Sequence, residues 1–77
     1  MALIHKKVLS LTAETIKASK LLDIQMQYGL AVIWYETGEI KFKLDPVGTG
    51  FEPPTDYTYF KTIEQNGLVY HYYVNTN

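Results

Sequence analysis

The stretch NGLVYHYYV, residues 66–74, decides the fold of this chain. Asn-Gly is a favoured pair for a tight turn between two antiparallel strands, and the seven residues after it are typical of a strand. Alternate side chains of a strand point to opposite faces, and here both faces carry apolar or aromatic groups. One face can join the core of the protein. The other face must also be shielded from water, and this stretch alone does not show which part of the protein, or which other molecule, packs against it.

The residues before this turn, 57–65, predict the partner strand of a hairpin. Side chains that face each other across a hairpin lie on the same side of the sheet. We expect one side to pack in the core of the domain: Tyr59, Ile63, Tyr70, Tyr72 and Val74. We expect the reverse side to contact another chain: Phe60, Val69, His71 and Tyr73.

Residues 16–28 alternate between apolar and polar side chains, which indicates a half-buried strand. The alternative is a short helix over residues 13–22 with Thr12 as its N-cap. A shorter alternation over residues 9–13 suggests an additional first strand. Thr37-Gly38 is a plausible turn of a further hairpin, which would pair Ile33 with Phe42. On the reverse face of that hairpin lie Val32 and Trp34.

Residues 45–56 hold all three prolines and two of the five glycines, so they predict a long irregular loop. The chain has 77 residues, which is enough for a single domain. We therefore expect one β-rich domain over residues 1–77. Its fold class is all-β, a small antiparallel sandwich or open barrel of five to six strands, with the possible short helix at 13–22.

Composition excludes several classes of protein. There is no cysteine, so disulfides and thiolate metal sites are absent. All seven cationic residues are lysine and the net charge is −1, which argues against nucleic-acid binding because arginine is the usual residue for phosphate and guanine contacts. No apolar run is long enough to cross a membrane as a helix, and the N-terminal residues do not resemble a signal peptide. The sequence leaves the location unknown, and a virion and the cytoplasm are the two options that fit it.

The sequence contains no catalytic, cofactor or metal signature, so we do not expect an enzyme. Gly48-Thr49-Gly50 lacks the lysine and the strand–turn–helix setting of a phosphate-binding loop. The two histidines, His5 and His71, have no spacing typical of a metal site. Glu36 and Glu39 would flank an exposed turn rather than line a cleft.

The covered second face leads to a hypothesis about function. A chain this small buries only about 60% of its unfolded surface, and without disulfides oligomerisation is the remaining way to stabilise it. We expect a non-enzymatic structural or interaction protein in a homo-oligomeric assembly, for example a capsid-decorating or tail protein of a virion. Its partners would be further copies and other structural proteins, with no cofactor. The predicted interface is Val32, Trp34, Phe60, Val69, His71 and Tyr73.

Two alternatives remain open at this point. The first is a small inhibitor module that docks on a foreign protein. The second is a sugar or single-strand binder that stacks its ligand on a tyrosine-rich face of the sheet, since seven tyrosines are present.

Overall fold

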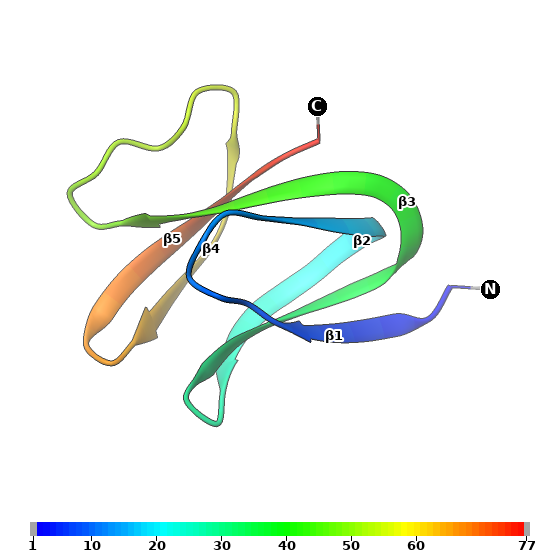
Figure 1. Ribbon diagram of the computed structural model, residues 1–77, viewed down its shortest axis with the longest axis horizontal. Coiled ribbons are helices and arrows are strands. Elements are labelled where there is room, and N and C mark those ends of the chain that lie inside the picture. The colour runs from blue at the N-terminus through cyan, green and yellow to red at the C-terminus, as the bar shows by residue number, and fades with distance from the viewer. Residues whose placement is uncertain (1, 77) are drawn as a thin grey trace.

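A computed structural model describes residues 2–76 of the chain as one antiparallel sheet of five strands (Figure 1). The strands are β1 (Ile4–Val8), β2 (Glu14–Gln27), β3 (Leu30–Gly48), β4 (Thr58–Gln65) and β5 (Leu68–Asn75). The sheet is strongly curled but does not close into a barrel. The all-β prediction is therefore confirmed, and the alternative of a helix over residues 13–22 is wrong because β2 includes residues 14–22 and Ala13 lies in the loop before it.

The long strand β3 organises the sheet. Along one edge it pairs with β2 over most of its length, from Leu30 to Leu44. Its other edge is shared, because β1 pairs with residues 32–36 and β5 pairs with residues 43–48. Between these two segments β3 turns sharply, as Figure 1 shows. The bend divides the sheet into a first half, made with β1, and a second half, made with β5 and β4.

Gly38 makes the bend possible. Between the Ala18–Ile40 and Lys20–Glu36 pairs, three residues of β3 lie opposite Ser19 alone. A Cβ atom at Gly38 would overlap the backbone of Ala18 and Ser19, so only glycine lets the two strands cross this closely. The predicted hairpin turn at Thr37-Gly38 is therefore wrong, and so is its pairing of Ile33 with Phe42. The glycine there serves a close approach of two strands rather than a turn.

Two tight turns have the same backbone geometry. At the β4–β5 turn Asn66 and Gly67 have φ of 54° and 81°, as the Asn-Gly prediction requires. At the β2–β3 turn Tyr28 and Gly29 have φ of 54° and 79°. Tyr28 is an unusual residue for this conformation, because bulky side chains disfavour positive φ. Its side chain is 96% exposed.

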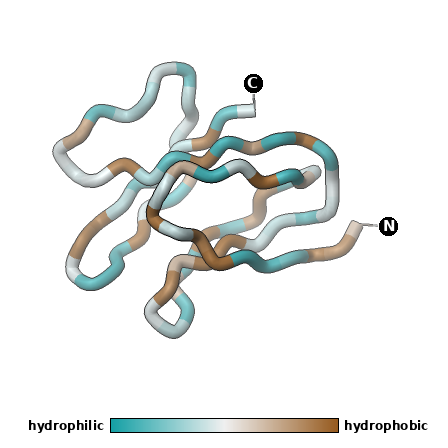
Figure 2. Tube along the Cα trace, viewed as in Figure 1, coloured by the Kyte–Doolittle hydropathy of each residue, from teal (hydrophilic) through white to brown (hydrophobic). Residues whose placement is uncertain are grey.

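The core lies on the concave side of the curled sheet and is entirely apolar or aromatic among the described residues. Along the second half of β3 hydrophobic and hydrophilic residues alternate (Figure 2), so one side of the strand faces inward. The largest fully buried side chains are Tyr72, Ile24, Ile33 and Leu44. Partly buried residues that pack on the core include Tyr35, Phe42, Phe60, Tyr70 and Val74.

Two predicted boundaries differ from the structure. Residues 9–13 form a loop rather than a strand, in which only Leu9 enters the core and its N–H donates to Ala31 O at 2.8 Å. The edge strand β1 was not predicted. The Pro/Gly loop is shorter than 45–56, because β3 continues to Gly48 and the loop spans residues 49–57. Pro46 fits in β3 because β2 begins opposite Leu44, so one edge of β3 is free there.

Candidate functional site

The convex side of the first half of the sheet forms an apolar face. We define it by Ile4 and Val8 of β1 and by Leu30, Val32 and Trp34 of β3. The strand register places these side chains on the side opposite the core, because Val32 pairs with Val8 while its neighbours Ala31 and Ile33 are core residues. Ile4 is 66% exposed, and Val8 and Leu30 are about half exposed.

Val32 is only 2% exposed although it lies outside the core cluster. Lys6 explains part of its burial. The Lys6 ammonium donates a hydrogen bond to Gln27 Oε1 at 3.1 Å. The Lys6 side chain therefore extends from β1 to β2 and crosses β3 near Val32. The apolar stem of a lysine can cover such a side chain while its charge stays in water. A side chain of the protein itself therefore covers Val32, whereas the neighbouring side chains of Ile4, Val8 and Leu30 remain exposed to solvent.

The convex side of the second half has a different character and forms a lysine–tyrosine face. We define it by residues from four strands: Lys17, Lys41, Lys43, Tyr59, His71 and Tyr73. Lys17 is the direct partner of Lys41 across β2 and β3. Tyr73 lies between Asp45 and Tyr59 in the next strands. The three lysines are exposed, and Tyr59 is 53% exposed.

Hydrogen bonds fix the aromatic part of this face. His71 Nε2 lies 3.0 Å from Thr49 Oγ1, and His71 Nδ1 lies 2.9 Å from Thr62 Oγ1. Thr62 Oγ1 is in turn 2.8 Å from the Tyr59 hydroxyl. A neutral imidazole donates from one nitrogen and accepts at the other, so the direction of this chain of bonds depends on the tautomer. The rings of Tyr59 and Tyr73 meet edge to face at 5.9 Å.

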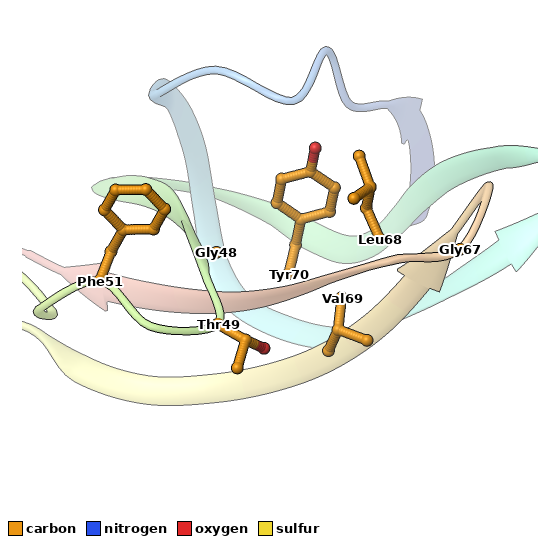
Figure 3. Close-up of a pocket in the computed structure, with 7 residues that line it drawn as sticks. All are labelled: Gly48, Thr49, Phe51, Gly67, Leu68, Val69 and Tyr70. Atoms are coloured by element: carbon orange, nitrogen blue, oxygen red, sulfur yellow. The ribbon is translucent and has the colours of Figure 1, made fainter.

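An open apolar cleft of about 450 Å³ lies where β5 begins and β3 ends (Figure 3). Phe51, Leu68 and Tyr70 point to one side of β5, whereas Thr49 and Val69 point to the other. The ring of Phe51 lies against Gly48, which has no side chain to displace it, and Phe51 is 77% exposed. A smaller hollow of about 200 Å³ lies beside His71 and Tyr73 and is also lined by Thr49 and Phe51.

The structure separates the six residues of the predicted interface. Val69, His71 and Tyr73 are half-buried on the convex side of the second half, and Trp34 is half-buried on the apolar face. Val32 is buried on the apolar face. Phe60 lies on the core side, which corrects its predicted outward position. A bulge lies in β4 between the Tyr59–Tyr73 and Lys61–Tyr72 pairs. It reverses the expected directions of two side chains, so Phe60 points into the core and Tyr59 points outward.

The sequence did not reveal the other residues of the two faces, because they become neighbours only through the strand register. Alternation within β2 and β3 places Lys17, Lys41 and Lys43 on the polar sides of their own strands. It does not show that the polar side of β2 and the polar side of β3 lie on the same face of the sheet. Ile4 and Val8 belong to a strand whose five residues are all exposed, so it has no buried face to detect.

Among residues 2–76, no group of three or more His, Asp or Glu side chains could hold a metal ion. The same part of the chain contains no helix that is long and apolar enough to span a membrane. No protein-family model matches the chain, and neither the curated proteins nor the solved structures include one that is significantly similar to it.

Proposed function

We propose that this protein is a non-enzymatic interaction protein that assembles with copies of itself through its apolar face. The observation that carries this proposal is the exposure of Ile4, Val8 and Leu30 around the half-buried Trp34 on one side of the sheet. Exposed apolar surface of this kind is typical of a contact between proteins, and aromatic residues are enriched in such contacts.

The charges around the apolar face favour a second copy as the partner. The same side of the sheet carries Lys6 and Lys20 together with Asp23 and Glu36. A face with both signs of charge is self-complementary, because a twofold axis can set Lys6 or Lys20 of one copy against Glu36 of the other, whereas Asp23 already pairs with Lys61 of its own chain. The small size of the chain adds a reason, since association buries surface that a domain of 77 residues cannot bury alone.

Contact between faces fits better than pairing of strand edges. Among residues 2–76, β1 pairs only with β3, so no strand of that part of the chain covers its outer edge. Lysines on an edge strand disfavour such pairing, and β1 contains Lys6 and Lys7, which would approach their counterparts in a second copy. We therefore expect the apolar faces to stack and the edge of β1 to stay open.

Trp34 provides a direct measurement, because it is the only tryptophan in the chain. We expect the mass from sedimentation velocity to rise with protein concentration, and the Trp34 emission to shift to shorter wavelength over the same range. Replacing both exposed residues of β1, Ile4→Glu with Val8→Glu, should give a folded monomer whose Trp34 emission does not change with concentration. The double substitution brings charges into the contact at positions that carry no core packing.

The matched control is Leu68→Glu, which changes an equally exposed apolar residue of β5 at the open cleft. It should assemble as the unsubstituted chain does. A chain that stays monomeric up to millimolar concentration would overturn the proposal. Assembly that persists in the Ile4→Glu, Val8→Glu variant with unchanged emission would show that a different face makes the contact.

A further inference from the structure

The lysine–tyrosine face contains three lysines that form no ion pair among the described residues, on a side of the sheet that also carries Asp45 and Glu64. Lys17 and Lys41 are direct cross-strand partners, and Lys43 follows in the next row on the same side. Within residues 2–76 the ion pairs are Lys7–Glu14 and Lys61–Asp23, so none of these three ammonium groups has a carboxylate partner. Like charges directly opposite each other destabilise a sheet. An anion bound between them would remove this repulsion.

Two aromatic rings, Tyr59 and Tyr73, lie on the same side of the sheet as these charges, with their planes at 74° to each other. Tyr59 pairs with Tyr73, which pairs with Asp45 of β3. Asp45 is four residues from Lys41 along β3, which corresponds to roughly 13 Å in a strand. The ring of Tyr59 is held by its edge contact with Tyr73 and by its hydroxyl, which meets Thr62. A ring that is already fixed loses little freedom when a ligand stacks on it.

We propose that the lysine–tyrosine face binds single-stranded nucleic acid, with the phosphates over Lys17, Lys41 and Lys43 and the bases on Tyr59 and Tyr73. A single strand has regularly spaced negative phosphates along its backbone and flat bases that project from it. Proteins that bind single strands combine a positively charged groove for the backbone with aromatic side chains on which the bases stack. A duplex does not fit, because its bases are already stacked within the helix.

Two features of the chain define the kind of binding. Lysine meets phosphate as a point charge and lacks the planar fork with which arginine reads guanine, so the face should tolerate any base sequence. Asp45 lies beside Tyr73 on this face and repels phosphate, which places the backbone over the lysines rather than over the rings. The net charge of −1 does not oppose such binding, because the strand register gathers three of the seven lysines on one side.

Fluorescence anisotropy with labelled oligothymidylate and oligouridylate tests the proposal, and the two probes distinguish DNA from RNA. At low salt we expect binding of single strands and much weaker binding of a duplex of the same length. Three phosphate contacts predict a slope of about −2 when the logarithm of the binding constant is plotted against that of the salt concentration.

The variants separate charge from stacking. Lys17→Gln with Lys41→Gln should weaken binding and reduce the slope to about −0.7, the value for one contact. Tyr59→Ala should weaken binding about 5- to 150-fold, as expected for one lost base stack, and leave the slope unchanged. Two matched controls lie outside the face and should bind within about twofold of the unsubstituted chain, Lys20→Gln and Tyr28→Asn, where asparagine also tolerates positive φ.

Three results would overturn the proposal: no binding of either oligonucleotide at low salt, equal affinity for duplex and single strand, or a Tyr59→Ala variant that binds as tightly as the unsubstituted chain. Inorganic polyphosphate that competes as well as the oligonucleotides would also show that only charge is recognised. The inference does not depend on self-assembly, because the Ile4→Glu, Val8→Glu variant keeps the lysine–tyrosine face intact and should bind normally.

Discussion

Tyr72 has the largest fully buried side chain of the core, yet its hydroxyl has no hydrogen-bond partner among residues 2–76. A buried hydroxyl without a partner costs about 1–3 kcal/mol of desolvation. Tyr72→Phe removes the hydroxyl and keeps the ring that fills the core. We expect this variant to be more stable by roughly 1 kcal/mol, as measured by the midpoint and slope of urea unfolding.

The same residue makes the folded state sensitive to alkali. Burial, with smaller contributions from the charges of Glu14 and Tyr70, raises the pKa of Tyr72 to about 12 from an ordinary value of 10.0. The folded protein therefore holds this proton more tightly than the unfolded chain. Its contribution to stability is complete below pH 10.0 and is lost as the pH rises through about 12. Tyr72→Phe should lose less stability over this range than the unsubstituted chain does. A Tyr72→Phe variant that is less stable at neutral pH would show that the hydroxyl has a partner.

At the scale of strands, Gly38 is the residue on which the curled sheet depends. Gly38→Ala would push a Cβ atom into the backbone of Ser19, which cannot rotate away as a side chain would. We expect a loss of roughly 3 kcal/mol or more in the free energy of unfolding, at the upper end of overpacking costs. Gly48→Ala in the same strand is the matched control, because its Cβ would meet only the Phe51 side chain at 3.4 Å. It should change stability by less than about 1 kcal/mol. Equal effects of the two substitutions would contradict the close crossing.

Gly38 also illustrates what the sequence could and could not predict. Asn66-Gly67 was correctly predicted as a turn, because both residues tolerate the positive φ that this turn needs. Thr37-Gly38 has a similar pattern, yet its glycine is required by a strand that is distant in the sequence. The alternation in residues 16–28 correctly predicted a strand, since β2 buries one side against the core. Strand β1 has no buried side and therefore left no periodic signal.

The candidate surfaces were predictable only in part for the same reason. Parity correctly placed Tyr70, Tyr72 and Val74 toward the core, but the bulge at Phe60 reversed the expected positions of Phe60 and Tyr59. The role of Val69, His71 and Tyr73 in a contact stays a prediction. The virion setting, the inhibitor and the sugar-binding alternatives also stay predictions, because nothing in the fold bears on them.

For the whole molecule, two contacts hold together the seam where the curled sheet stays open. The Lys61 ammonium on β4 lies 3.1 Å from Asp23 Oδ1 on β2, and Gln65 Nε2 donates to Gly29 O at 3.2 Å. Lys61 is the cross-strand partner of the core residue Tyr72, and its side chain reaches the edge of the sheet at Asp23. At the other end of β2, Glu14 meets Lys7 of β1 at 3.1 Å and accepts from the Ser10 N–H at 2.7 Å. Carboxylates therefore connect β2 to both outer strands.

These carboxylates predict that the whole fold weakens in acid. Burial raises the pKa of Glu14, but the Ser10 N–H and Lys7 outweigh it, so the pKa lies below 4.5. The Gln25 side chain, with Lys61 and the Ile24 N–H, outweighs desolvation and lowers the pKa of Asp23 below 3.8. Both groups hold their protons less tightly in the folded state, so their contribution is present above pH 4.5 and is lost as the pH falls through the folded values. Because both ion pairs are partly exposed, we expect them to contribute only about 1 kcal/mol together to the free energy of unfolding.

Urea unfolding measured across acid pH should show this loss of stability, and the double variant Glu14→Gln with Asp23→Asn should lose less. Glu52→Gln in the exposed loop is the control for removing one negative charge. An unchanged acid dependence in the double variant would mean that these two ion pairs do not stabilise the fold.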